Sequence, residues 1–325
     1  MASLIHSPRI LSVQSHVVSG YCGNKSATFP LQLLEFEVDF VNTVQLSNHT
    51  QYKVVRGQIY RSEDLRELHT GLKLNNFLHL YDHVLSGYIA DATYIESMAR
   101  MIEDIKKERL SKALDCWYTL DPVLGDEDTG YYVPDGANIA ESYRRNLLPL
   151  ADIITPNRFE ASILSGIPID GSSGDAVEQA IRATKVFHEL YGIKIVAITS
   201  FQVATEKDRL TCLLSCNPAE LSNGSAGRDQ IDREVWKISV PKLDCPFTGS
   251  GDLFAALITA WLRKTDFDFK KSFENTANTV HDILLDTLSW CQLINDGSVH
   301  SHELRLIQNK QHILNPKSRF VAERI

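Results

Sequence analysis

The chain has 325 residues, of which 43% are hydrophobic and 23% are charged, and its formal net charge is −8. These fractions are typical of a globular protein and exclude the disordered, collagen-like and membrane-embedded classes. A net negative charge also argues against nucleic acid or an anionic membrane as a partner, since both need a basic protein face. Any anionic ligand must therefore be held locally.

The six cysteines indicate reduced thiols rather than a disulfide framework or a structural zinc site. They are scattered, without Cys-x-x-Cys pairs or histidines at zinc-binding spacing. The segment Met1–Pro8 lacks the basic and apolar regions of a secretion signal, and no run reaches the roughly 18 apolar residues of a membrane span. We therefore expect a cytoplasmic protein that is not inserted in a membrane.

Short β-rich runs alternate with helical stretches over the first two thirds of the chain. The expected pairs of strand and helix are Arg9–Ser15 with Asn24–Phe36, Val38–Leu46 with Ser62–Asn75, His83–Tyr88 with Thr93–Glu108, and Cys116–Leu120 with Ala140–Leu148. A strand Asp152–Thr155, helices from Asn157 and over Asp175–Tyr191, and a strand Ile193–Thr199 continue the order. This alternation predicts an α/β fold of three layers, with a mostly parallel central sheet between helices.

The pattern changes near residue 209. Arg209–Cys216 and Glu234–Val240 read as an antiparallel hairpin at the sheet edge, and the polar segment between them, 217–233, as an exposed mobile loop. An apolar helix Leu253–Arg263 follows, with more helix to about Leu293. No internal repeat or long linker is evident, so we expect a single domain over residues 1–325.

One polar motif leads directly into the apolar helix: Thr248-Gly249-Ser250-Gly251-Asp252. Ligands of open α/β sheets bind at the carboxyl ends of the strands, so such a motif has functional weight. Its glycines allow close backbone approach, and the first N–H groups of the helix can hold a phosphate. Asp252 would then lie where a carboxylate can take a hydroxyl proton. The alternative is that Asp252 only stabilises the helix start, by about 0.3–1 kcal/mol.

Two further motifs follow expected strands and offer oxygen ligands. Asp121 and Asp126 stand five residues apart in a turn after a strand, where they can collect Mg²⁺; the alternative is an Asp-Pro turn. Asn157 and Glu160 lie on one face of a helix start and could orient metal-bound water. Their alternative role is a variant of the capping box.

Polar residues also end the first two expected strands, in Ser12-Val13-Gln14-Ser15-His16 and Ser47-Asn48-His49-Thr50. Hydroxyls and imidazoles at neighbouring strand ends can line a polar substrate pocket, although exposed loops are polar too. The segment Gly20-Tyr21-Cys22-Gly23-Asn24-Lys25-Ser26 lacks the glycine spacing of a Walker motif. Phe254 occupies the third glycine position of a dinucleotide fingerprint, which makes NAD an unsuitable ligand.

Together these motifs resemble the pyridoxal kinase family of the ribokinase-like superfamily, in the order of that family and over nearly the whole chain. The resemblance also includes Phe29-Pro30-Leu31-Gln32, Gly87-Tyr88, Tyr132-Val133-Pro134 and Thr155-Pro156-Asn157-Arg158-Phe159-Glu160. It implies a ribokinase-like fold, the use of ATP with Mg²⁺ and a monovalent cation (K⁺ or Na⁺), and a homodimer. It further implies phosphorylation of pyridoxal, pyridoxine and pyridoxamine at the 5′-hydroxymethyl group.

The resemblance also implies roles for single residues. Asp252 is expected to be the catalytic base, with Gly249, Ser250 and Gly251 as the anion hole. The residues expected in the metal and phosphate network are Asp121, Asp126, Thr155, Asn157 and Glu160. Those expected to contact the pyridine substrate are Ser15, Thr50 and Tyr88, with Asp252. Tyr132 belongs to the loop that closes over ATP, and the expected nucleotide pocket also includes Thr199, Ser200 and Thr248.

The chain departs from the family pattern in three places. Ser250 stands where the family usually has Thr, the loop between Asp126 and Tyr131 is shorter than in the animal enzymes, and Phe201 replaces a polar residue beside the adenine. Two other functions fit the same scaffold. One is a kinase for another small alcohol, such as a sugar or hydroxymethylpyrimidine, and the other is a non-catalytic protein that binds the vitamers or a partner.

Overall fold

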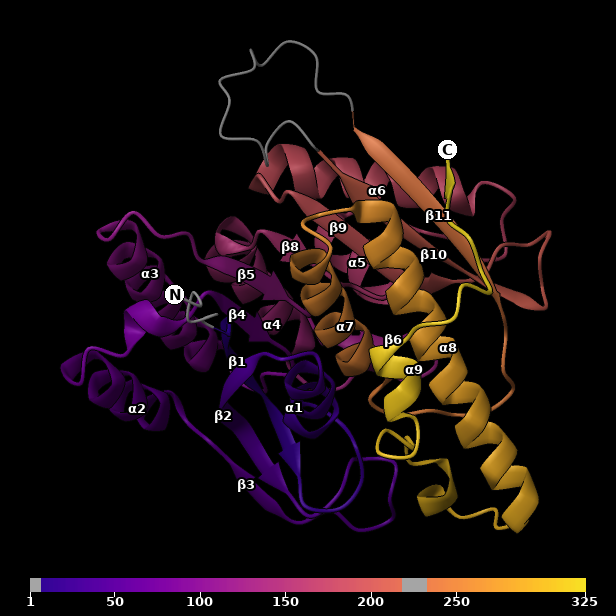
Figure 1. Ribbon diagram of the computed structural model, residues 1–325, viewed down its shortest axis with the longest axis horizontal. Helices are drawn as coiled ribbons and strands as arrows, with labels where there is room; N and C mark the ends of the chain where they lie inside the picture. The colour runs from indigo at the N-terminus through magenta and orange to yellow at the C-terminus, as the bar shows by residue number, and fades with distance from the viewer. Residues whose placement is uncertain (1–6, 218–232) are drawn as a thin grey trace, which may run out of the picture.

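A ten-stranded sheet lies between two layers of helices in the computed structural model, which describes residues 7–217 and 233–325 (Figure 1). The order of the strands is β12-β11-β10-β9-β8-β5-β4-β1-β2-β3. The predicted mobile loop, apart from its two end residues, lies outside the described residues. The prediction of a three-layer α/β fold is confirmed.

The six central strands are parallel, as the alternation of strands and helices predicts. Their bounds are β2 (Glu37–Leu46), β1 (Arg9–Val17), β4 (His83–Ser86), β5 (Trp117–Leu120), β8 (Ile153–Ile154) and β9 (Ile195–Phe201). Parallel strands need helices on both faces of the sheet, and most residues of β1, β4, β5, β8 and β9 are accordingly buried. Their carboxyl ends all lie at one edge of the sheet.

Antiparallel strands complete both sides of the sheet. On one side lie β10 (Arg209–Cys216), β11 (Glu234–Pro241) and β12 (Glu323–Arg324), and on the other β3 (Gly57–Ile59). The predicted hairpin is therefore confirmed, but its position at the edge is wrong, because β12 pairs with β11. A separate small hairpin joins β6 (Gly125–Asp126) to β7 (Gly130–Tyr131).

The helices divide between the two faces of the sheet (Figure 1). One layer holds α1 (Asn24–Leu33), α7 (Ser250–Lys264), α8 (Phe269–Ile294) and α9 (Lys310–Leu314). The other holds α2 (Ser62–Leu74), α3 (Ala92–Leu110), α4 (Gly136–Ser142), α5 (Arg158–Ser165) and α6 (Ala176–Tyr191). The short turns are η1 (Leu78–Leu80), η2 (Tyr143–Leu147), η3 (Leu148–Leu150) and η5 (Val299–His302). The helix expected over 140–148 thus starts earlier and ends in a π turn.

Alternate residues of β1 supply the two cores. Leu11 and Val13 pack on the side of α2 to α6, whereas Ile10 packs on the side of α1, α7, α8 and α9. This alternation follows from the period of two in a strand. Each fully buried aliphatic side chain contributes about 1.5–3 kcal/mol, so both helix layers are held mainly by apolar packing.

The chain connections reverse direction at the carboxyl edge of the sheet. From β1 the chain crosses over α1 to β2 on one side, and from β4 it crosses over α3 to β5 on the other side. Right-handed crossovers in opposite directions put the two helices on opposite faces. The point where the direction changes, between β1 and β4, is where open α/β sheets bind ligands.

All six cysteines lie in the described ranges and are free thiols, in agreement with the expectation from the sequence. Within the described part of the chain, no helix has the length and apolar character that crossing a membrane requires.

Asp152, at the start of β8, is a buried carboxylate that two lysines neutralise. Its oxygens lie 2.8 Å from Lys106 Nζ and 2.9 Å from Lys194 Nζ, and it accepts a hydrogen bond from the backbone N–H of Tyr118. Burial raises its pKa, but the lysines outweigh burial, so the pKa is lowered. The stabilisation is therefore present above the unfolded-state pKa of about 4 and is lost as pH falls through the lower folded-state pKa.

We expect Asp152→Asn to lower the free energy of unfolding by about 1–3 kcal/mol near neutral pH, because it leaves two cations without their partner. The difference from the wild type should shrink at a pH below the unfolded-state value of about 4, toward the lowered pKa of the wild-type carboxylate. Urea unfolding at the two pH values measures this. An equal difference at both would show that the charge of Asp152 contributes nothing.

Candidate active site

The expected site residues come together at the carboxyl edge of the sheet. Asp121 follows β5 directly, Thr155 follows β8 directly, and Tyr88 lies two residues beyond β4. Ser15 lies near the end of β1, where its register with β2 shifts. Because the carboxyl ends of parallel strands share one edge of the sheet, residues more than 130 positions apart in the sequence lie at that edge.

The glycine motif is the N-terminus of α7. Gly249, the residue before the helix, has φ +82°, and a Cβ on it would lie 2.1 Å from the backbone oxygen of Tyr21. Only glycine fits there without strain. Ser26 Oγ donates a hydrogen bond to Gly249 O at 2.9 Å. The first N–H groups of this long, mostly buried helix thus face the edge where the strands end, and such a terminus holds an anion well.

Asp252 lies in the first turn of α7 and connects to a distant segment. Its Oδ2 accepts a hydrogen bond from Gly23 N at 2.7 Å, and its side chain makes no capping bond within its own helix. Burial raises its pKa, and the bond from Gly23 lowers it in part. The result is a carboxylate more basic than an exposed aspartate, which suits a proton acceptor.

Asp121 is a buried carboxylate with only 3% of its surface exposed. Among the described residues, its Oδ2 has no hydrogen-bond partner. Burial, followed by the charges of Glu160 and Asp252, raises its pKa well above the usual value; Thr155 lies beside it, short of hydrogen-bond geometry, and offsets the rise only in part. An Asp-Pro turn does not account for such a group, because a turn would use the carboxylate as an acceptor.

Asn157 and Glu160 form the capping box of α5. Asn157 Oδ1 accepts from Glu160 N at 2.9 Å, and Glu160 Oε2 accepts from Asn157 N at 2.8 Å. Glu160 Oε1 also accepts from Leu124 N at 3.0 Å, which ties α5 to the segment after β5. Burial raises the pKa of Glu160 to about 8, against the effect of these backbone donors. The alternative named from the sequence is therefore confirmed for this pair.

Asp126 lies in the β6–β7 hairpin and is occupied by hydrogen bonds within it. Its Oδ1 accepts from the backbone N–H and the hydroxyl of Thr129, and its Oδ2 accepts from Tyr132 Oη at 2.9 Å. Burial raises its pKa, but these donors outweigh it and the pKa is lowered. Glu127 of the same hairpin pairs with Arg158 of α5. In residues 7–217 and 233–325, no three His, Cys, Asp or Glu side chains are grouped as metal ligands.

The residues expected to contact the pyridine ring follow or end three neighbouring strands: Ser15 lies near the end of β1, Thr50 follows β2, and Tyr88 follows β4. Ser15 packs against Gly23, where an added Cβ would lie 2.0 Å from Ser15 O. Tyr88 is partly buried, and its carbonyl accepts a hydrogen bond from Thr43 at 2.7 Å. Thr50 is exposed and directly follows the buried His49.

The expected nucleotide residues on β9 differ from the sequence interpretation in one respect. The strand continues beyond Thr199 and Ser200 to Phe201, which is 2% exposed and packs in the core of the α2–α6 side. Phe201 is therefore a core residue rather than an exposed residue at the strand end. Thr199 and Ser200 remain partly exposed near the carboxyl end of the strand.

Asp121 Oδ2, Thr155 Oγ1 and Thr248 Oγ1 are among the buried polar atoms that lack hydrogen-bond partners in the described part of the chain. Buried polar atoms are nearly always hydrogen-bonded in native proteins, so a group of exceptions requires an explanation. A carboxylate and hydroxyls are oxygen groups of the kind that Mg²⁺ and phosphate groups bind. The residues present thus fit a magnesium ion with a nucleotide.

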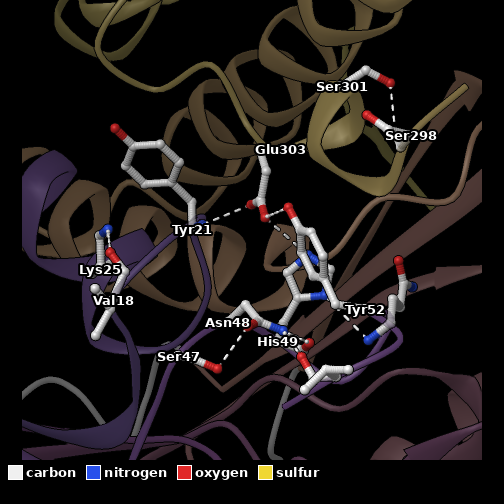
Figure 2. Close-up of polar contacts among 12 residues, drawn as sticks. Val18, Tyr21, Lys25, Ser47, Asn48, His49, Tyr52, Ser298, Ser301 and Glu303 are labelled. Atoms are coloured by element: carbon white, nitrogen blue, oxygen red, sulfur yellow. Dashed lines mark hydrogen bonds and ion pairs between the residues drawn. The ribbon is translucent and has the colours of Figure 1, made fainter. Parts of the chain in front are cut away.

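Sequence reasoning missed the partners that hold these groups in place. Gly23 and Ser26 contact Asp252 and Gly249, although the sequence motif that contains them suggested no role beyond family resemblance. Glu303 accepts hydrogen bonds from Tyr21 and Tyr52, as Figure 2 shows. These contacts join positions more than 200 residues apart, and no local pattern in a single sequence predicts them.

The comparisons with known proteins agree with the geometry. Residues 84–295 match the family model described as phosphomethylpyrimidine kinase. The chain is 37% identical over 317 residues to pyridoxal kinase of Homo sapiens, covering 95% of this chain and 96% of that protein. It is also 37% identical over 317 residues to pyridoxal kinase of Arabidopsis thaliana, covering 97% of this chain and 94% of that protein.

Solved structures give the same result. Pyridoxal kinase from Leishmania donovani in complex with ADP and pyridoxine superposes with a TM-score of 0.85 at 33% identity, covering 98% of this chain and 99% of that one. The complex of that enzyme with ADP and pyridoxamine gives a TM-score of 0.86 at 32% identity, covering 98% of this chain and 100% of that one. The chain therefore belongs to the pyridoxal kinase family and has its ribokinase-like fold.

Proposed function

We propose that the chain transfers the γ-phosphate of ATP to the 5′-hydroxymethyl group of pyridoxal, giving pyridoxal 5′-phosphate and ADP, and that it also phosphorylates pyridoxine and pyridoxamine. The curated relatives are pyridoxal kinases, and the Leishmania donovani structures contain ADP with pyridoxine or with pyridoxamine. The observation that carries the proposal is Asp252, a carboxylate of raised pKa in the first turn of the helix that Gly249 precedes. A proton acceptor and an anion site thus occupy one helix end.

In this proposal Asp252 takes the proton of the attacking hydroxyl while the N–H groups at Gly249, Ser250 and Gly251 hold the transferred phosphoryl group. Phosphoryl transfer needs positioning and electrostatic stabilisation more than covalent help from the protein. Donors fixed by the fold supply this stabilisation without reorganising during the reaction. Gly249 can approach closely because its φ is positive and it has no side chain.

The other expected residues complete the proposal. Asp121, Thr155, Glu160 and Asp126 would hold Mg²⁺ directly or through water, and that ion supplies charge neutralisation to the phosphates. Asn157, Tyr132, Thr199, Ser200 and Thr248 would line the nucleotide site, and Ser15, Thr50 and Tyr88 the vitamer site. A monovalent cation, a homodimer, a cytoplasmic location and a single kinase domain are proposed from the sequence resemblance.

A substrate panel tests the proposed function. Purified protein is given Mg²⁺, ATP and, in turn, the three vitamers, hydroxymethylpyrimidine and ribose, and the phosphorylated products are measured. We expect the three vitamers to have the highest kcat/KM. Preference for hydroxymethylpyrimidine or ribose would assign the chain to another small alcohol. Binding of vitamers without any product would indicate a non-catalytic role.

Asp121→Asn should raise the Mg²⁺ concentration for half-maximal activity by about tenfold or more, because it removes the charge of a buried carboxylate at the carboxyl edge whose Oδ2 has no described hydrogen-bond partner. Pyridoxal binding should change less than about twofold. Asp268→Asn is the matched control, because Asp268 accepts a hydrogen bond from Lys271 N at the start of α8 and is not in the proposed metal network; its Mg²⁺ titration should be unchanged. An unchanged Mg²⁺ titration for Asp121→Asn would remove Asp121 from the metal network.

A further inference from the structure

The carboxylate of Glu303 joins three segments that are far apart in the sequence. Glu303 follows η5 near the C-terminus, and its side chain is 8% exposed. Its Oε2 accepts a hydrogen bond from Tyr21 N at 2.9 Å, and its Oε1 lies 2.9 Å from Tyr52 Oη and 3.1 Å from His49 Nε2 (Figure 2). The C-terminal part of the chain thus contacts two loops, residues 20–23 after β1 and residues 47–52 after β2.

The first of these loops, residues 20–23, leads to the proposed base. Tyr21 donates its N–H to Glu303, and its carbonyl packs against Gly249, where an added Cβ would be 2.1 Å away. Two residues on, Gly23 N donates to Asp252 at 2.7 Å. Gly20 has φ +90°, and an added Cβ there would lie 2.2 Å from Glu303 Oε1, so the carboxylate touches the backbone itself.

The second loop, residues 47–52, carries Thr50. His49 is buried, and its Nδ1 accepts a hydrogen bond from Gln51 N at 3.3 Å. In neutral imidazole the other nitrogen then carries the hydrogen, so Nε2 donates to Glu303. The His49 ring also contacts the Tyr52 ring, with centroids 4.8 Å apart. Thr50 therefore lies in the chain between His49 and Tyr52, and both of these side chains contact the carboxylate of Glu303.

The chemistry of the carboxylate explains why three donors converge on it. Burial alone raises the pKa of Glu303, but hydrogen bonds from His49, Tyr21 and Tyr52 outweigh it and the pKa is lowered. An ionised carboxylate has only acceptors, and each of its oxygens faces a donor here. A glutamine amide in its place would turn two hydrogens toward at least one of these donors, and one loop would lose its contact.

We propose that Glu303 is a positioning residue for the phosphate acceptor: it fixes the 20–23 loop, which contacts Asp252, relative to the 47–52 loop, which carries Thr50. It does not touch the reacting atoms and acts through Tyr21, His49 and Tyr52. The proposal rests on the proposed function, because it assigns Asp252 to the hydroxyl and Thr50 to the ring of one substrate molecule.

The test compares Glu303→Gln with Asp286→Asn. Asp286 anchors the same C-terminal region, since its Oδ2 accepts from Arg305 at 2.9 Å and Asn309 at 2.8 Å, but it contacts neither loop in the described structure. For each variant, kcat and KM are measured with pyridoxal and ATP varied separately, together with ATP binding and the melting temperature. Small displacements of reacting groups can lower rates up to about 100-fold.

We expect Glu303→Gln to lower kcat/KM for pyridoxal by about 10- to 100-fold while ATP binding stays within about twofold. Asp286→Asn should lower the melting temperature without this selective loss. Equal losses for both substrates in both variants, or unchanged kinetics of Glu303→Gln, would overturn the proposal.

If Glu303→Gln does not fold, Tyr52→Phe replaces it, because it removes one donor to Oε1 and keeps the ring. A selective loss of about two- to fivefold in kcat/KM for pyridoxal supports the proposal, and unchanged kinetics overturn it. The kinetics of the wild type in the same assay distinguish a failure of the proposed function from a failure of the proposed role of Glu303. A wild type that does not phosphorylate pyridoxal refutes the proposed function, whereas an active wild type with an unaffected variant refutes only the role of Glu303.

Discussion

Replacing Asp252 with Asn should lower kcat by about 10²–10⁴ while nucleotide binding stays largely intact, the range that a positioned general base contributes. Asn keeps the shape of the side chain but cannot accept the proton of the substrate hydroxyl. Burial raises the pKa of Asp252, so in the wild type the base becomes active as pH rises through this raised value. The slow residual activity of the variant should not increase with pH in this way.

Asp268→Asn is the matched control for Asp252→Asn. Asp268 precedes α8, where its side chain accepts a hydrogen bond from Lys271 N at 3.0 Å, and an asparagine caps a helix equally well. Asp252 lies at the N-terminus of α7 and Asp268 lies beyond its C-terminus, so Asp268 is remote from the carboxyl edge. The control should have normal kcat. Near-normal turnover of a folded Asp252→Asn variant would leave Asp252 with only the role of stabilising a helix start.

The second large effect is expected for Gly249→Ala, which should lower kcat/KM for pyridoxal by about 10²–10³, as the loss of a single anion-hole donor does in other enzymes. The new Cβ would lie 2.1 Å from Tyr21 O and would occupy a left-handed conformation, so the start of α7 must move. The N–H groups that hold the phosphoryl group would then no longer point at it.

Gly192→Ala separates the loss of the anion hole from backbone strain. Gly192 has φ +70° at the C-terminus of α6, and an added Cβ there meets no described atom within 4 Å. Both variants should lose on the order of 1–3 kcal/mol of stability from the left-handed conformation, but only Gly249→Ala should lose activity. Equal kinetics of the two folded variants would show that the backbone at Gly249 does not contribute to catalysis.

The parallel core of the fold could be predicted from the sequence, because its strands and helices have distinct periods and alternate along the chain. The small elements could not. β12 has only the exposed residues Glu323 and Arg324, and it is a strand because β11 offers it an open edge. The strands of the β6–β7 hairpin are two residues each, too short for any period to be read.

The candidate site was predictable where a rule of fold topology applied. Strand ends gather at one edge in a parallel sheet, which brought Asp121 and Thr155 to the edge where α7 begins. The capping role of Glu160 was also readable, because a capping box is local. The contacts of Glu303 and Gly23 were not readable, since they depend on loops that meet only after the sheet and helices have packed.

The most direct test of the central claim follows the phosphate itself. Purified protein is incubated with pyridoxal, Mg²⁺ and ATP labelled in its γ-phosphate, and the position of the label is determined by phosphorus NMR and mass spectrometry. The account predicts one labelled phosphate on the 5′ oxygen of pyridoxal for each ADP formed. Label found only in inorganic phosphate, or no release of ADP in the presence of pyridoxal, would contradict it.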